Sequence, residues 1–454
     1  MNTDTICAVA TAPGGALGIV RVSGPEALPI VGAFCPCVTA TTPANTVHFT
    51  RIIDQADIID EAMVSVFRAP HSYTGEDCAE ISCHGSHYIL NNVIELLIRN
   101  GARLAYPGEF TQRAFLNGKM DLSQAEAVAD LIASKNKASH DLAIKQLRGG
   151  ISSELKTLRD QLLRLTSLLE LELDFSDHEE LEFADRTELL TLAETIDQRI
   201  TSLARSFETG QAIKSGIPVA IVGKTNVGKS TLLNQLVAEE RAIVSDTHGT
   251  TRDTIEDTMD IHGITFRIID TAGIRQTSDA VERIGIERTY AAIGRARIVL
   301  WIIDSEPAPS DIREMLELTN GKSLIVIQNK CDIKTDFTTH LASSALLASA
   351  TVHSISAKQG TGISSLLTAI YRAAHIPELS ENNIIVTNAR HYEALCRAHD
   401  SLSRVIHGLT SSLPSDLIAE DLRLTLDALA DITGGAITPQ ETLNNIFSHF
   451  CVGK

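Results

Sequence analysis

The sequence predicts a multidomain α/β and α protein, in which an N-terminal α+β domain precedes a helical domain split by an inserted, doubly wound α/β domain. Three observations support this fold class. Short strand and helix patterns mix before residue 119, a leucine stripe without strand signals runs from 119 to about 210, and apolar strands alternate with helices from 216 to about 373. The predicted domains are residues 1–118, residues 119–215 with 376–454, and the inserted domain at 216–375.

Composition and charge limit the class of protein. The 454 residues are long enough for two to four domains, and 44% of them are hydrophobic. The start, MNTDTICAVATAPG, lacks the basic and apolar regions of a signal peptide, and no apolar run is long enough to span a membrane. Eight cysteines show no disulfide pattern, so a cytoplasmic location is the simplest expectation. A net charge of −18 argues against a protein that coats itself broadly with nucleic acid, but it allows a local basic groove.

Short strand patterns in the N-terminal part fall at 15–23, 61–69 and 78–85. An amphipathic helix is predicted over 86–99, ending near Asn100 and Gly101. Two clusters could in principle hold a metal: Cys35 with Cys37, and Cys83 with two histidines. Because neither completes a tetrahedral ligand set, we favour ordinary thiols and a packed turn.

The two helical segments carry leucines at steps of three and four. The first stripe predicts a long helix that packs on partner helices, and the second predicts a helix that stops at Gly434. The acidic run at 174–185 is interpreted as a solvated connection between helices. The stripes are Leu155, Leu158, Leu162, Leu165 and Leu169, then Leu422, Leu426 and Leu429.

A phosphate-binding loop is predicted at 223–230, GKTNVGKS, between an apolar strand at 218–222 and a helix at 231–237. Gly223 and Gly228 allow the tight curl that turns backbone N–H groups toward phosphate oxygens, and the following helix N-terminus adds a favourable dipole. Lys229 is placed to reach the β- and γ-phosphates, and the Ser230 hydroxyl to ligate Mg²⁺.

Three further motifs follow in the order that a GTPase requires, each after a predicted strand. Asp270 to Gly273 (DTAG) can hold a Mg²⁺-bound water and the γ-phosphate, and Asp332 of NKCD can accept guanine N1–H and the exocyclic amine. The motif at 356–358 (SAK) can offer an N–H to guanine O6. A hydroxyl of the segment GTTRD, here Thr251, can complete the Mg²⁺ shell as part of a switch. The inserted domain is therefore predicted to be a Ras-like G domain.

The residue after the DTAG glycine is Ile274, where Ras-like enzymes have a glutamine that orients the attacking water. Either hydrolysis is very slow or another group serves. Glu282 is the acidic candidate nearby, and the positive charge that an arginine finger normally supplies must come from Arg275 or a bound cation.

Three blocks outside the common GTPase motifs resemble the MnmE (TrmE) family of tRNA wobble-uridine modification GTPases. They are 108–119 (GEFTQRAFLNGK) with 121–132, the inserted domain with GTTRD, and the ending FCVGK at 450–454. The resemblance covers essentially the whole chain. Two departures, His248 in the loop before GTTRD and Ser86 in place of a usual glycine, remove no polar ligand.

The resemblance implies an N-terminal domain that binds a tetrahydrofolate derivative and forms a constitutive homodimer. It also implies K⁺ beside the nucleotide, activation by G-domain dimerisation, and a water-positioning role for Glu282. With an FAD-dependent MnmG-type subunit, in a heterotetramer, such a protein adds an aminomethyl or carboxymethylaminomethyl group to C5 of uridine 34 of certain tRNAs, using a methylene-tetrahydrofolate carbon. Cys451 takes the family's terminal cysteine position, where an inert thiol is the alternative to a reactive one.

The residues predicted for each ligand are the following. The folate site comprises Arg21, Glu80, Lys119 and Lys454, and the K⁺ site Asn226, Ser245, Thr247 and Thr250; Mg²⁺ is assigned to Ser230 and Thr251. The GTP site comprises Asn226, Val227, Gly228, Lys229, Ser230, Thr231, Ser245, Asp246, Thr247, His248, Gly249, Thr250, Thr251, Asp270, Thr271, Ala272, Gly273, Asn329, Lys330, Asp332, Ser356, Ala357 and Lys358.

Two other functions compete with this interpretation. One is a regulatory GTPase of ribosome assembly, which would share the G domain but not the flanking blocks. The other is a folate-dependent aminomethyltransferase that is merely gated by GTP. Folate retention by the N-terminal segment would eliminate the first, and loss of C5-modified uridine on gene deletion would separate the wobble-uridine function from the second.

Overall fold

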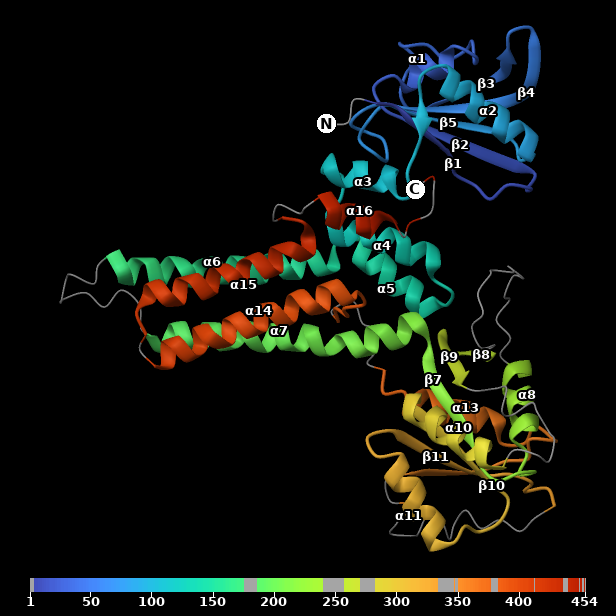
Figure 1. Ribbon diagram of the computed structural model, residues 1–454, viewed down its shortest axis with the longest axis vertical. Helices are drawn as coiled ribbons and strands as arrows, with labels where there is room; N and C mark the ends of the chain where they lie inside the picture. Colours follow the sequence, from blue (N-terminus) through green and yellow to red (C-terminus); the bar gives the residue numbers. More distant parts are fainter. Residues whose placement is uncertain are drawn as a thin grey trace. The chain divides into compact units, whose positions relative to one another are not determined.

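A computed structural model describes residues 4–174, 186–239, 257–269, 282–333, 347, 350–376, 383–411, 413–435, 440–448, 450 and 453 (Figure 1). The chain forms two compact units. Unit 1 comprises Met1–Ala133, Ala143–Ile200 and Glu393–Lys454, and unit 2 comprises Ser134–Leu142 and Thr201–Tyr392. The predicted fold class is confirmed: an N-terminal α+β part leads into helices, and a doubly wound α/β domain interrupts those helices. The exact domain boundaries stay predictions.

The N-terminal part of unit 1 is built on a six-stranded sheet in the order β3-β4-β5-β2-β1-β6. Its strands are antiparallel apart from the β1–β6 pair. Helix α2 begins after the N-cap Ser86, whose side chain accepts from the Tyr88 N–H, and packs Val93 and Leu97 into the core of the sheet. The elements are β1 (Ile6–Val9), β2 (Leu17–Ser23), α1 (Ala27–Gly32), β3 (Thr46–Asp54), β4 (Asp57–Phe67), β5 (Cys78–His84), α2 (His87–Arg99), β6 (Arg103–Leu104) and α3 (Glu109–Leu116).

The helical part of unit 1 joins segments far apart in the sequence. The predicted stripe from Leu155 to Leu169 is buried along α6, and α15 packs against that helix. Helix α15 ends at Thr433 because Gly434 adopts φ +75°, as the sequence predicts. The helices are α4 (Leu122–Ala133), α5 (Lys137–Leu147), α6 (Gly150–Asp174), α7 (Arg186–Ser215), α14 (Ala389–Thr410), α15 (Ser415–Thr433) and α16 (Gln440–Ser448).

Unit 2 contains a second six-stranded sheet, in the order β12-β11-β10-β7-β9-β8, parallel except for β8. Successive residues of β10 face opposite sides: Leu300 packs in the core with α8 and α13, and Trp301 in the core with α10 and α11. A strand buried on both faces must be apolar throughout, which explains the continuous run IVLWII. The elements are β7 (Ile217–Val222), α8 (Lys229–Glu239), β8 (Asp257–Ile261), β9 (Ile264–Ile269), α10 (Glu282–Arg295), β10 (Ile298–Ile303), α11 (Pro309–Leu318), β11 (Ser323–Gln328), β12 (Thr351–Ser354) and α13 (Ile363–Ala373).

The start of α5 belongs to unit 2, although the chain on both sides of it belongs to unit 1. The Ala138 N–H donates to the carbonyl of Gly263 at 3.0 Å, in the turn between β8 and β9. The Asn136 side-chain amide donates to the Thr265 hydroxyl at 2.7 Å, and Ala138 and Leu142 are buried in the core of the second sheet. We call this contact the hairpin dock.

All strands predicted from sequence are present, and four more strands among the described residues were not predicted: β1, β3, β6 and β8. Each of the four is short, or lies at the edge of its sheet with alternating exposed residues. Within the described ranges, no helix combines the length and the apolar character needed to cross a membrane.

Candidate nucleotide-binding site

The predicted phosphate loop lies between β7 and α8, at the carboxyl edge of the second sheet (Figure 1). Two of its glycines are required by geometry. Gly223 has φ +152°, and a Cβ there would lie 2.3 Å from the Ile302 carbonyl oxygen; Gly228 has φ +103°, and a Cβ would lie 2.2 Å from the Asn329 amide nitrogen. Asn226 also adopts a positive φ of +61°. The loop is therefore curled as tightly as phosphate binding requires.

Lys229, the first residue of α8, folds back over the loop. Its ammonium group donates to the carbonyls of Gly223 at 2.6 Å and Lys224 at 2.7 Å. Burial lowers the pKa of Lys229 from its ordinary value. The amine is thus held above the loop, where a β- or γ-phosphate would replace these neutral partners with a charged one.

Asn329 connects three of the four motifs that the sequence assigns to GTP. Its buried side-chain amide donates to the Val227 carbonyl of the phosphate loop at 2.8 Å, and its oxygen accepts from the Ala357 N–H at 3.0 Å. Ser356 is buried and holds the same turn through its N–H, which donates to the Thr361 carbonyl at 3.0 Å. One side chain therefore fixes the base-reading loops relative to the phosphate loop.

Lys330 and Asp332 flank this connection with different roles. Lys330, at φ +66°, donates to the Asn226 carbonyl at 2.7 Å and forms an ion pair with Asp304 at 2.8 Å. Asp332 lies in an exposed turn after β11. An exposed carboxylate in this turn can accept the paired donors of guanine. Thr231 and Lys358 are exposed on the neighbouring elements.

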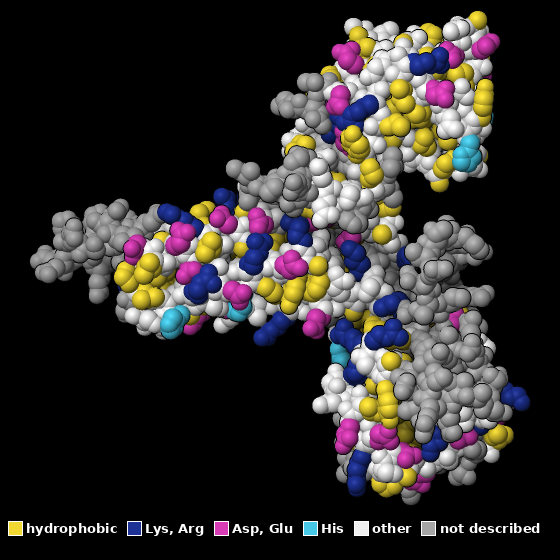
Figure 2. Space-filling model, in the orientation of Figure 1, with side chains coloured by type: hydrophobic (Ala, Val, Ile, Leu, Met, Phe, Trp, Pro, Cys, Tyr) yellow, Lys and Arg dark blue, Asp and Glu magenta, His cyan; other side chains and the backbone are white. Residues whose placement is uncertain are grey.

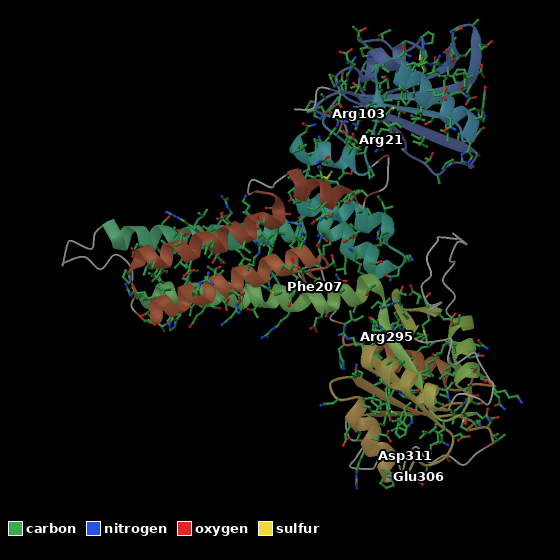
Figure 3. All side chains as sticks on the ribbon, viewed as in Figure 1. Arg21, Arg103, Phe207, Arg295, Glu306 and Asp311 are labelled. Atoms are coloured by element: carbon green, nitrogen blue, oxygen red, sulfur yellow. The ribbon has the colours of Figure 1, made fainter. Side chains whose placement is uncertain are left out.

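Two carboxylates at this edge were not predicted. Asp304 follows β10 and pairs with Lys330. Asp311 of α11, which is labelled in Figure 3, pairs with Lys224 of the phosphate loop at 3.0 Å. The available signal for Asp304 was a polar residue at the carboxyl end of a buried parallel strand. Asp311 gave no such signal, because it lies on a helix surface.

Several predicted residues lie outside the described part of the chain. Glu282 begins α10, and its backbone alone is described. The others are Ser245, Asp246, Thr247, His248, Gly249, Thr250, Thr251, Asp270, Thr271, Ala272, Gly273, Arg275, Cys451 and Lys454. The structure therefore brings together the phosphate loop and the two base-reading motifs, and the switch and cation assignments stay predictions.

A second cluster forms in unit 1 around Arg21 (Figure 3). Arg21 and Glu80 face each other across β2 and β5, with the Arg21 Nε 2.8 Å from the carboxylate. The Arg21 guanidinium lies 5.4 Å from the Tyr73 ring centroid and 5.7 Å from that of Phe110, and it donates to the Gly453 carbonyl at 3.2 Å. The half-buried Arg21 guanidinium, near the start of the chain, thus contacts both aromatic rings and Gly453 at the end of the chain.

Lys119 contacts the loop that carries Tyr73 into this cluster. Its ammonium donates to the Pro70 carbonyl at 2.8 Å, and the Asn117 amide holds the Thr74 carbonyl at 2.7 Å. A planar ligand could stack near the aromatic rings and meet a carboxylate and cations, so the described residues fit a pterin with an anionic tail.

A glycine-flanked phosphate loop tied to guanine-reading motifs, on a doubly wound sheet, defines a P-loop GTPase. Comparisons with known proteins agree. Residues 5–119 match the family described as GTP-binding protein TrmE N-terminus, and residues 122–451 match the MnmE helical domain. The chain therefore belongs to the MnmE family.

The relatives match along their whole length. A tRNA modification GTPase MnmE of Phocaeicola vulgatus is 53% identical over 100% of this chain and 99% of its own, and one of Bacteroides thetaiotaomicron is 53% identical over 100% of both. Among solved structures, the G domain of the T. maritima FeoB iron transporter is 24% identical over 35% of this chain and 99% of its own, at a TM-score of 0.26.

Proposed function

We propose that this protein hydrolyses GTP and that this activity serves the modification of tRNA. The observation that carries the proposal is the Asn329 side chain, which holds the phosphate loop and the turn of Ala357 in one arrangement. The Asp332 carboxylate is exposed in the turn that follows Asn329, which supports a role in accepting the two donors that only guanine offers. Purified protein should hydrolyse GTP and not ATP, measured as phosphate release with Mg²⁺ present.

The modification we propose is the addition of an aminomethyl or carboxymethylaminomethyl group to C5 of uridine 34, in a complex with an FAD-dependent MnmG-type subunit. The whole-length similarity to proteins named tRNA modification GTPase supports this over ribosome assembly. Mass spectrometry of tRNA nucleosides from cells lacking the gene should show loss of C5-modified uridine, restored by the wild-type gene. Normal modification in the deletion strain would contradict the proposal.

A folate site in unit 1 is part of the same proposal. Arg21, Glu80 and Lys119 would hold a tetrahydrofolate derivative, together with Lys454 and with Cys451 close by in the sequence. The folate would supply the one-carbon unit. The cation and carboxylate already paired across β2 and β5 support this assignment. Equilibrium dialysis with 5-formyl-tetrahydrofolate should detect binding that Glu80→Gln weakens. Equal retention by both proteins would refute the role of Glu80.

We also propose that K⁺ bound beside the nucleotide accelerates hydrolysis, with Arg275 as the alternative source of positive charge. Glu282 would position the attacking water, and homodimerisation of the G domains would be the activating step. The Asn226 side chain is exposed on the phosphate loop, and its backbone is fixed by Lys330, which leaves the amide oxygen free to serve a cation. Replacing KCl with NaCl at equal ionic strength should greatly slow hydrolysis. The Asn226→Ala variant should lose the difference between the salts, and equal wild-type rates in both salts would exclude the K⁺ site.

A further inference from the structure

Five cations gather at the amino edge of the second sheet, at the opposite end of the strands from the phosphate loop. We call this group the basic edge. Figure 2 shows Lys and Arg side chains on this part of unit 2, where Figure 3 labels Arg295. The basic edge comprises Arg267, Arg295, Arg297, Lys322 and Arg372.

The backbone contacts show that these residues are neighbours. The Arg297 N–H donates to the Pro218 carbonyl at 2.9 Å, and Pro218 pairs with Arg267 across β7 and β9. Lys322 directly precedes β11, and its ammonium donates to the carbonyls of Gly294 and Ala296 that flank Arg295. The Ser323 hydroxyl donates to the Ala373 carbonyl at 2.8 Å, which places the last turn of α13, with Arg372, beside the same edge.

Within the described ranges, four cations of the basic edge have no carboxylate partner: Arg295, Arg297, Lys322 and Arg372. In the described part of the chain, Arg295, Arg297 and Arg372 form no ion pair, and Lys322 bonds only carbonyl oxygens. Glu317, at the end of α11 near this edge, pairs with none of them. By contrast, arginines of the N-terminal part each face a carboxylate, namely Arg21, Arg51, Arg68, Arg99, Arg103 and Arg113.

Helix stability explains only part of this arrangement. Arg295 and Arg372 lie in the last turns of α10 and α13, where a cation offsets the helix dipole. Arg297 precedes a strand and Arg267 lies within one, so the dipole does not account for them. Four of the five are arginines, whose planar guanidinium matches phosphate oxygens in a bidentate way.

We propose that the basic edge docks the phosphate backbone of tRNA. The proposal deepens the proposed function and rests on it for the identity of the RNA. Four adjacent strands spaced about 4.8 Å apart make this edge roughly 14 Å wide, enough to contact several phosphates of one RNA strand. A local basic surface also resolves how a chain of net charge −18 can hold a polyanion. Since the edge lies opposite the phosphate loop, tRNA and GTP can bind unit 2 together.

The test is the affinity of the full-length protein for tRNA transcript at several salt concentrations, measured by fluorescence anisotropy. In R295Q/R297Q/R372Q, Kd should rise about tenfold at 100 mM salt, and the log–log salt slope should fall by about 3. R295K/R297K/R372K keeps the charge and should retain most of the affinity. The matched control is R148Q/K156Q/R159Q, which removes three exposed, unpaired cations from unit 1 and should bind tRNA as the wild type does.

GTP affinity and circular dichroism confirm that each variant is folded. The proposal is overturned if the Gln variant keeps the wild-type Kd and slope, or if the unit 1 control weakens binding equally. Loss of binding to the FAD-dependent subunit with unchanged tRNA affinity would assign the edge to a protein partner instead. If the wild-type protein binds no tRNA and deletion cells keep the C5 modification of the wobble uridine, both this proposal and the proposed function fail. If the wild type binds tRNA and the Gln variant binds it equally well, this proposal alone is overturned.

Discussion

At the scale of single residues, the nucleotide site depends on side chains that hold loops rather than ligands. Asn329 is buried and uses both ends of its amide, one on the carbonyl of Val227 and the other on the N–H of Ala357. A carboxylate in its place would lack the donor, and a shorter side chain would reach neither partner. The identity of this residue therefore follows from backbone groups on two other loops.

Asn329→Ala should destabilise unit 2 and weaken GTP binding, because it leaves a buried carbonyl and a buried N–H unpaired. Each such group costs about 1–3 kcal/mol. Chemical denaturation and titration with a fluorescent GTP analogue would measure the two effects. The control is Asn320→Ala, an exposed asparagine in the turn after α11, which should change neither. Wild-type affinity in Asn329→Ala would contradict the connecting role.

Asp332→Asn should weaken GTP binding by about 1–3 kcal/mol, because an amide cannot accept both guanine donors. The same amide can donate to a carbonyl at C2 of the base, so xanthosine triphosphate should regain part of the lost affinity. Competition titrations with the two nucleotides would measure the exchange. Unchanged preference for GTP would show that Asp332 does not read the base.

The tight turns of the phosphate loop were predictable from the sequence, but the ion pairs that support the loop were not. Gly223 and Gly228 were predictable because steric limits on φ leave little choice at a tight turn. The pairs Lys330–Asp304 and Lys224–Asp311 were not, because each joins residues far apart in the chain and a charged residue alone does not indicate its partner.

At the scale of elements, α3 is anchored by a buried group of charges. The Glu109 carboxylate accepts from the guanidinium groups of Arg103 and Arg113, and from the Tyr106 N–H at 2.9 Å. Asp4 pairs with the same two arginines. Burial alone would raise the pKa of Glu109, but the hydrogen bond from Arg103, with those from Tyr106 and Arg113, lowers it below its ordinary value.

The sign of the pH dependence follows from that lowered pKa. Ionised Glu109 stabilises the fold at pH above the ordinary carboxyl pKa, and this contribution is lost as pH falls through the lower folded value. Glu109→Gln should cost about 2 kcal/mol at pH 7, because Arg103 and Arg113 lose a buried charged acceptor, although Asp4 still pairs with both and Glu76 with Arg113. The cost should shrink in acid. Denaturant unfolding at a series of pH values would measure it.

The control for this group is Glu61→Gln, which breaks the exposed pair of Glu61 with Arg51. Exposed ion pairs contribute roughly 0–1 kcal/mol, so little change is expected there. A loss for Glu109→Gln that does not vary with pH would show that the side chain acts by packing and not by charge.

The strands with the clearest sequence signal differ physically from those that were not predicted. Strands β7, β10 and β11 are buried on both faces and read as unbroken apolar runs. Strand β3 exposes Val47 and Phe49 at a sheet edge, and β8 interleaves Met259 and Ile261 with polar residues, so neither gives a continuous signal. Their pairing partners decide their structure, and one stretch of sequence does not reveal partners.

At the scale of the whole molecule, the helical part of unit 1 depends on segments that the inserted domain separates in sequence. The apolar stripe of α6 is covered by α15, more than two hundred residues later in the chain. The leucine periodicity predicted that α6 packs on other helices, but it could not identify which ones, because any amphipathic helix presents a similar face.

Truncation after residue 412 should therefore expose the stripe from Leu155 to Leu169 and leave the nucleotide site of unit 2 complete. We expect increased binding of a hydrophobic dye, loss of the cooperative unfolding transition of the helical part, and retained GTP affinity. Calorimetry and nucleotide titration would measure these separately. Loss of GTP affinity together with the helical transition would show that the two units do not fold independently.

The hairpin dock has a thermodynamic consequence. The turn held by Asn136 and Ala138 lies, in sequence, between the two segments predicted to contact Mg²⁺, K⁺ and the γ-phosphate, 245–251 before β8 and 270–273 after β9. If nucleotide binding shifts the hairpin, it changes the free energy of the hairpin dock. Thermodynamic linkage then requires that weakening the hairpin dock changes the free energy of nucleotide binding by the same coupling energy. The start of α5, whose neighbours in sequence belong to unit 1, would then influence nucleotide affinity without contacting the nucleotide.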